Sequence, residues 1–161
     1  MDAIEMLEEQ HRDVEDLFEE LESADAADVQ DLFDELADSL AVHALIEEMH
    51  FYPAVRSRRT PDIPLESLEE HVIIKRLLAE MLKLDPSNRS FEAKLATLKQ
   101  AVEEHVTEEE DELFPRVRKV LDEVQLAALA EDMSVTQENL LDAGQPRDRV
   151  RPAVDEAASL R

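Results

Sequence analysis

The sequence predicts an all-α protein, and three observations support this prediction. One glycine occurs among 161 residues, so the chain has few of the left-handed turn positions that β-rich folds use freely. Alanine, leucine, glutamate and methionine, which are strong helix formers, recur throughout the chain. Apolar residues return every three or four positions in four long segments, as in helices that bury one face. We therefore expect an up-down-up-down four-helix bundle with a fifth, C-terminal helix.

The first two helices are predicted from their apolar seams. The first should run from about Asp2, its N-cap, to about Ser23, and its seam contains Ile4, Leu7, His11, Val14, Phe18 and Leu21. A turn follows, with Asp28 as the expected cap of the second helix. The second seam contains Leu32, Leu36, Leu40, His43, Glu47 and His50. Pro53 then removes a backbone hydrogen bond and should kink this helix rather than end it.

The later helices follow a connection at residues 59–64, which contains two prolines. A third helix is expected at about 65–84, with Leu68, His71, Ile74, Leu78 and Met81 inward. After a turn at 85–88, the fourth seam contains Phe91, Leu95, Leu98, Val102, His105, Glu109 and Glu112. A shorter helix at about 122–141 should pack across one end of the bundle. The helical domain would then span residues 1–143, with residues 144–161 as a tail that is loose or docked only locally.

Composition excludes several classes of function. A formal charge of −24 disfavours nucleic acids and anionic membranes, since both bind lysine- and arginine-rich surfaces. The acidity fits either a solvated surface or adaptation to a salt-rich cytoplasm. Without cysteine the chain has neither disulfides nor thiolate metal ligands. Its first residues lack the pattern of a signal peptide, and no apolar run approaches the ~18 residues of a membrane span, so we expect a cytoplasmic protein.

Two halves of the sequence share one pattern, in which an inward histidine precedes an HxxxE motif and a proline. The matched residues are His11, His43, Glu47 and Pro53 in the first half and His71, His105, Glu109 and Pro115 in the second. Each histidine lies about 13 to 15 helical residues from the turn that joins the two helices of its half, or roughly 20 Å at 1.5 Å per residue. In an up-down-up-down bundle, four imidazoles and two carboxylates therefore converge at one level of the axis.

A purely structural role could explain each of these histidines or HxxxE motifs alone, but it does not explain their combination. A lone inward histidine is more often a core residue, and with 41 acidic residues in the chain an HxxxE motif arises easily by chance. ExxH matches, such as Glu47 with His50, arise in the same way. Two carboxylates on otherwise apolar seams, however, need a compensating cation. A metal site is therefore favoured over a metal-free acidic helical scaffold.

The ligand types restrict the choice of metal. Imidazole and carboxylate suit iron, manganese, zinc or nickel, and no thiolate directs the choice toward copper(I). Two carboxylates on diagonally opposed helices are placed to bridge two ions. Because imidazoles outnumber carboxylates, the cluster should favour iron(II) and encounters with O₂, NO or peroxide.

At this point the residues resemble the hemerythrin-like, or HHE cation-binding, family over about residues 1–121. The matching elements are Asp2-Ala3-Ile4 before His11, Val14 and Leu17-Phe18; His43, Glu47-Glu48 and Phe51-Tyr52-Pro53; Glu70-His71; and His105, Glu109-Glu110 and Leu113-Phe114-Pro115. The resemblance implies two iron ions in an oxo- or hydroxo-bridged, non-haem di-iron site. It also implies the ligands: His11, His43, His71 and His105 would be terminal, and Glu47 and Glu109 would bridge.

The sequence departs from the oxygen-carrying members of that family. Those use five histidines and a second motif of the form HxxxxD, whereas this chain has HxxxE and one histidine in its third helix. A vacant coordination position favours peroxide chemistry or gas binding over oxygen transport. Tyr52 is a candidate extra ligand, because one branch of the family uses a tyrosine before this proline. An ideal helix would set Tyr52 about 180° from His43, so a core or rim aromatic is the alternative.

His50 and Glu112 continue the metal-facing seams toward the bundle end. We expect them either to pair, directly or through water, as a polar gate beneath the metals or to reach solvent at a fraying end.

The sequence therefore predicts a hemerythrin-like protein that binds iron and reacts with O₂, hydrogen peroxide or NO, with catalase-like turnover as its enzymatic form. The alternative is a non-enzymatic iron- or oxygen-responsive binding or sensing module. Small molecules are the expected partners, and the pattern does not predict an oligomeric state.

Overall fold

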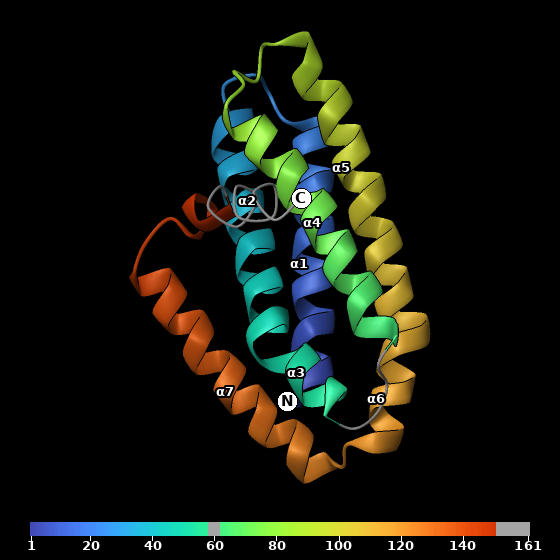
Figure 1. Cartoon of the computed structure of the whole chain (residues 1–161). Coiled ribbons are helices and arrows are strands. Elements are labelled where there is room, and N and C mark those ends of the chain that lie inside the picture. The colour runs from blue at the N-terminus through green and yellow to red at the C-terminus, as the bar shows by residue number, and fades with distance from the viewer. Residues whose placement is uncertain (58–61, 151–161) are drawn as a thin grey trace, which may run out of the picture.

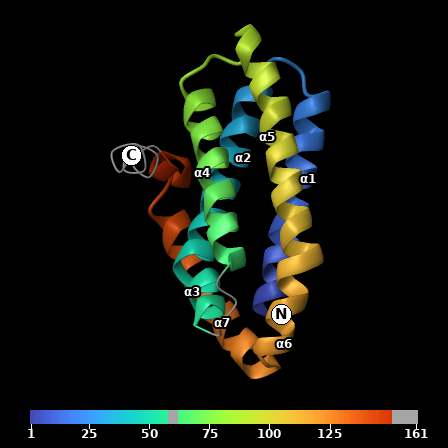
Figure 2. The ribbon, with the colours of Figure 1, turned by 45° about the vertical axis from the view of Figure 1, so that its right-hand side comes forward.

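Four helices run side by side in alternating directions: α1 (Ala3–Ser23), α2 (Val29–Ile46), α4 (Asp62–Leu82) and α5 (Arg89–Glu108) (Figures 1 and 2). The computed structural model describes residues 1–57 and 62–150, with the side chains of α4 from Glu66 onward. Within these ranges the chain has no strand, and none of the helices is long and apolar enough to cross a membrane. The predicted all-α bundle is confirmed. Because α4 begins at Asp62, the connection predicted at 59–64 is shorter than expected, and residues 58–61 lie outside the described ranges.

Helix ends follow local capping chemistry. Asp2 and Glu5 form a capping box, in which each backbone N–H donates to the other's carboxylate at 2.9 Å. Asn88 caps α5 through the N–H of Ser90. Asp28 precedes α2 as predicted, but its side chain makes no capping hydrogen bond.

Two helices continue beyond their glutamates through a π-helical turn. The turn η1 (Glu47–Phe51) leads into α3 (Tyr52–Arg56), and η2 (Glu109–Leu113) leads into α6 (Phe114–Val120). In each turn the next backbone N–H donates to a carbonyl five residues back, and a proline without an N–H follows directly. The additional residue rotates the side chains beyond it by about 100°. The predicted kink at Pro53 is therefore a π-helical turn that begins at the glutamate.

Helix α7 (Glu123–Asp142) contacts α1, α2 and η1 (Figure 1). It therefore lies along the side of the bundle. The sequence-based prediction that it packs across one end was wrong. Its buried residues explain this position, because they join an apolar cluster with the start of α1; they are Leu126, Ala130, Met133 and Leu140.

The chain reverses after α7, where Gly144 and Gln145 have φ values of 82° and 42°. The short 3₁₀ helix η3 (Pro146–Arg149) then docks on α2. The backbone N–H and guanidinium of Arg147 both donate to Asp38, each at 2.9 Å. The part of the predicted tail up to residue 150 is thus attached to the bundle, and residues 151–161 lie outside the described ranges.

The core divides into two apolar clusters. One surrounds Phe33 and Phe91 near the helix–helix turns, and the other surrounds Ile4 and Phe51 near α7. A layer of buried histidines and glutamates separates them, since His11 on α1 falls between the parts of that helix that join each cluster.

Candidate metal centre

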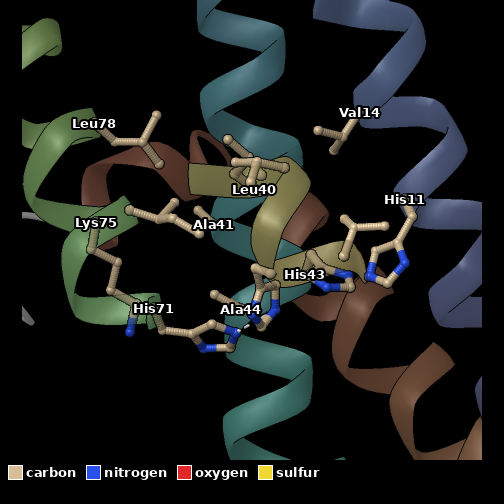
Figure 3. Close-up of a pocket in the computed structure, with 13 residues that line it drawn as sticks. His11, Val14, Leu40, Ala41, His43, Ala44, His71, Lys75 and Leu78 are labelled. Atoms are coloured by element: carbon tan, nitrogen blue, oxygen red, sulfur yellow. Dashed lines mark hydrogen bonds between the residues drawn. The ribbon is translucent and has the colours of Figure 1, made fainter. Parts of the chain in front are cut away.

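The six predicted ligand residues lie together in this polar layer. They are His11, His43, Glu47, His71, His105 and Glu109, and none has more than 6% of its surface exposed. Figure 3 shows His11, His43 and His71 extending from three different helices toward a common space. The six side chains therefore meet at one level of the bundle axis, as the distances along the helices had predicted.

The imidazoles form two pairs, one from each half of the repeat. The ring centroids of His11 and His43 are 4.8 Å apart, as are those of His71 and His105. Between the pairs, the rings of His43 and His105 are 6.4 Å apart. Two histidine pairs offer two separate positions for a cation.

Glu47 contacts both histidine pairs. Its Oε1 lies 3.0 Å from Nε2 of His43, 3.0 Å from Nε2 of His71 and 3.4 Å from Nε2 of His105. Bridging ligands of two ions need this kind of placement.

Glu109 makes the matching contacts from the diagonal helix. Its Oε1 lies 3.2 Å from Nε2 of His11, 3.7 Å from Nε2 of His43 and 3.0 Å from Nε2 of His105. The repeat in the sequence therefore corresponds to an approximate two-fold arrangement in space.

The electrostatics of the layer show that it is built around positive charge. Burial disfavours charged imidazole, yet Glu47 and Glu109 raise the pKa of His43 to about 9. His105 also has a raised pKa, because Glu109 outweighs the effect of burial. Burial and Glu47 act to raise the pKa of Glu109, but His105 brings it down to about 2. The lowered pKa values of Glu47 and Glu109 favour ionised carboxylates, and the raised pKa values of His43 and His105 favour protons at the places where a cation would balance this charge.

Unpaired buried atoms test whether a metal fits this layer. Among the described residues, Oε2 of Glu47 is a buried side-chain atom with no hydrogen-bond partner, and Nε2 of His43 makes no hydrogen bond despite its 3.0 Å contact with Oε1 of Glu47. Four potential ligand atoms, from His43, Glu47, His105 and Glu109, all lie within 4.8 Å of one another. Imidazole nitrogen and carboxylate oxygen are ligands that divalent transition metals accept. The donor set therefore fits a metal ion.

Two side chains that hold these histidines from outside were not predicted from the sequence. Nδ1 of His43 lies 2.7 Å from Oε1 of Gln10, and Nδ1 of His105 lies 2.6 Å from Oε2 of Glu70. Such partners orient a metal-binding imidazole and fix its tautomer. A signal was available, because Gln10 and Glu70 each directly precede the upstream histidine of their half.

The other two histidines face the residue that follows Glu47 or Glu109. Nδ1 of His71 is 3.3 Å from Glu48, and Nδ1 of His11 is 3.7 Å from Glu110. Lys75 donates to both oxygens of Glu48 at 2.7 Å, and Arg12 pairs with Glu110. Each of these carboxylates is thereby neutralised by a cation.

Tyr52 points into the centre. Its hydroxyl donates to Oε2 of Glu109 at 3.0 Å and lies 3.2 Å from Nε2 of His71, and only 1% of the residue is exposed. An unbroken α-helix would have turned it away from His43, and the rotation at η1 brings it inward. Burial and the two nearby carboxylates raise the pKa of Tyr52 well above its ordinary value.

His50 and Glu112 do not pair directly, and Glu112 follows the alternative expectation, in which it reaches solvent. His50 lies 2.6 Å from the hydroxyl of Thr136 on α7, while Glu112 is exposed beside other acidic residues of α5 and η2. The π-helical turns explain the difference, because they carry residues late in the turn off the metal-facing seam.

A small apolar cavity adjoins the four histidines (Figure 3). About 20 Å³ of it is open to the centre of a water-sized molecule. Apart from the histidines and the stem of Lys75, its walls are aliphatic; they are Val14, Leu40, Ala41, Ala44, Ile74, Leu78, Val102 and Val106. One water-sized or diatomic molecule would fill it.

Comparison with known proteins agrees with this geometry. The sequence profile of the hemerythrin HHE cation binding domain matches residues 2–117. The crystal structure of a hemerythrin HHE cation binding domain-containing protein from Mycobacterium kansasii is similar with a TM-score of 0.78 and 26% identity, covering 92% of this chain and 89% of that chain.

A second relative is a protein named DNA nickase from Nostoc sp. (strain PCC 7120 / SAG 25.82 / UTEX 2576). It is 30% identical over 131 residues, which cover 81% of this chain but 37% of that protein. The chain thus spans well under half of that relative's length. The match of the family profile over most of the chain, together with the buried histidine and glutamate layer, shows that the chain belongs to the hemerythrin HHE cation-binding domain family.

Proposed function

We propose that the chain binds two iron ions in the histidine and glutamate layer and reacts with hydrogen peroxide, O₂ or NO. The observation that carries this proposal is the apolar cavity, which opens on four buried imidazoles and has room for one very small molecule. Larger substrates would not fit there, and the aliphatic walls offer them no polar group for recognition.

The donor set supports iron as the metal. Four imidazoles and two carboxylates carry two negative charges, so a pair of divalent ions is held with residual positive charge that attracts an anionic or polarisable ligand. Bound iron would supply the redox and Lewis-acid chemistry, and the chain's own groups would position the ions and exclude bulk water. His11, His43, His71 and His105 would be the terminal ligands, with Glu47 and Glu109 as bridges.

Tyr52 supports a peroxide-directed role. Its hydroxyl lies beside Glu109 and His71, two of the six proposed ligands, and is close enough to serve as a further ligand when deprotonated. Peroxide disproportionation, in which two hydrogen peroxide molecules give O₂ and two water molecules, needs no external reductant. A catalase-like activity is therefore the enzymatic form of the proposal.

Metal analysis and a peroxide assay test the proposal together. The full chain, loaded with iron(II) without oxygen and then oxidised, should hold about two iron atoms and release O₂ from hydrogen peroxide. One zinc ion per chain, with no iron uptake, would contradict the proposed metal. Two iron atoms that bind O₂ or NO reversibly but leave peroxide intact would limit the function to gas binding.

A second candidate is an iron- or oxygen-responsive sensing module, and α7 is the observation that favours it. This helix is linked to the metal layer through Gln137, which accepts a hydrogen bond from Gln10, the partner of His43, and its Thr136 holds His50 in the turn that begins at Glu47. A change at the cluster would thereby reach a peripheral helix. Hydrogen exchange in α7 that slows on iron loading would support sensing.

DNA processing is not carried over from the cyanobacterial relative. The chain matches 37% of that protein, and its formal charge of −24 opposes the phosphate contacts that DNA binding needs.

A further inference from the structure

The two histidine pairs are held from outside by different chemistry. In the second half of the repeat, Nδ1 of His105 faces the carboxylate of Glu70 at 2.6 Å. At the equivalent place in the first half, Nδ1 of His43 faces the amide oxygen of Gln10 at 2.7 Å. The distances are nearly equal, so the difference between the halves is one of charge.

Helix α7 fixes the amide in this orientation. The side-chain N–H of Gln10 donates to Oε1 of Gln137 at 2.9 Å, which leaves the oxygen of Gln10 to accept from His43. A flipped amide would direct its N–H groups at the imidazole instead. Gln10 therefore acts as a neutral acceptor.

The remaining outer contacts do not cancel this difference. Glu48 and Glu110 occupy equivalent places and have similar side-chain exposure, 26% and 23%. Lys75 neutralises the first and Arg12 the second. Among the described residues, no lysine or arginine pairs with Glu70, so the second half carries one additional negative charge.

Hydrogen-bond geometry points the same way. Glu48 lies at 3.3 Å from His71, within hydrogen-bond range, whereas Nδ1 of His11 is buried without a partner and 3.7 Å from Glu110. A carboxylate acceptor makes an imidazole a stronger metal ligand, and changing such a partner typically alters metal affinity about 10- to 100-fold.

We infer that the two cation positions are unequal, with the His71–His105 pair binding its ion more tightly than the His11–His43 pair, and that Gln10 and Glu70 set this order as positioning residues. The inference rests on the two-ion centre proposed above. It assigns a tight and an exchangeable position to a cluster whose four histidines and two glutamates are arranged symmetrically.

A reciprocal exchange of the two residues provides the test. Metal-free full-length protein is titrated with cobalt(II), which reports binding through its visible absorption and has no redox step. The wild type should bind two ions in two steps whose dissociation constants differ about tenfold or more. Glu70→Gln should weaken the tighter step, and Gln10→Glu should strengthen the weaker one, so that each single variant approaches two equal steps.

The double variant Gln10→Glu/Glu70→Gln keeps the composition and net charge of the wild type. It should again show two unequal steps, with the order of the halves reversed. Glu69→Gln and Gln30→Glu, at exposed positions, control for the charge changes alone and should leave both steps unchanged. Thermal unfolding of each metal-free variant checks that the fold is retained.

Two equal steps in the wild type, or two unequal steps in both single variants, would overturn the inference. A wild type that binds two cobalt ions with equal affinity would overturn the inference but leave the proposed two-metal centre standing. Binding of fewer than two ions, by contrast, would reject the two-metal centre and the inference with it.

Discussion

Tyr52 and Phe114 occupy matching places in the two halves of the metal centre. Each follows a π-helical turn and precedes a proline. The ring of Phe114 stacks on His11 with centroids 5.9 Å apart, and the ring of Tyr52 lies 5.4 Å from that of His71. The one chemical difference between them is the hydroxyl, which Tyr52 directs at Glu109.

Replacing Tyr52 with phenylalanine tests whether that hydroxyl binds iron. The chain has one tyrosine, so any phenolate-to-iron(III) absorption band in the visible spectrum must come from Tyr52. Tyr52→Phe should abolish the band and should destabilise the metal-free protein by about 1–3 kcal/mol, because Glu109 loses a buried donor. An iron-loaded wild type without such a band would assign Tyr52 to hydrogen bonding alone.

Removing the carboxylate of Glu47 or of Glu109 distinguishes a metal centre from an acidic scaffold. Glu47→Ala should lower the iron content from about two atoms per chain to one or none, because its oxygen contacts both histidine pairs. Glu109→Ala should do the same, and Glu103→Ala, at an exposed position of α5, is the matched control. A scaffold would instead keep its metal content unchanged and gain a few kcal/mol of stability on losing a buried charge.

The positions of the histidines could be predicted because they depend on regular helices. His11 lies on an uninterrupted α-helix, so its distance from the turn and the direction of its side chain both follow from 3.6 residues per turn. Each HxxxE motif ends at the first residue of its π-helical turn, so Glu47 and Glu109 still fall where regular geometry places them.

The residues beyond the glutamates could not be predicted in the same way. A proline indicates a distortion but not its form, and a π-helical turn rotates everything after it by about 100°. That rotation brings Tyr52 in and takes Glu112 out to solvent. The partner of His50 was unpredictable for a different reason, since Thr136 lies on a helix whose docking side depends on tertiary packing.

Filling the apolar cavity tests whether small molecules reach the metal through it. Ala41 lines the cavity, and Ala41→Leu should slow peroxide consumption severalfold while leaving the iron content at about two per chain. Overpacking should cost about 1–3 kcal/mol of stability. Ala37→Leu, one turn away in the same helix and buried outside the cavity, should cost a similar amount without slowing the reaction. Equal rates in both variants would mean that peroxide approaches by another path.

The metal-free protein should have a pH dependence that iron removes. The pKa of His43 is raised from its ordinary value of 6.5 to about 9, so its contribution to stability is fully present below pH 6.5 and is lost as the pH rises through 9. The pKa of Glu109 is lowered from 4.5 to about 2, so its contribution is present above pH 4.5 and is lost as the pH falls through 2. The free energy of unfolding should therefore be greatest between about pH 4.5 and 6.5.

Urea unfolding of the metal-free protein at a series of pH values measures this effect. Between pH 6.5 and 9, the folded state holds a proton on His43 that the unfolded state has released, so stability should fall by on the order of 3 kcal/mol from this group alone. His43→Gln should flatten this part of the curve, whereas His50→Gln, which changes a histidine on the α7 side, should leave it intact. Iron-loaded protein should show no such fall, because metal binding displaces the proton and stabilises the neutral imidazole. A fall that persists in His43→Gln would assign the titration to another group.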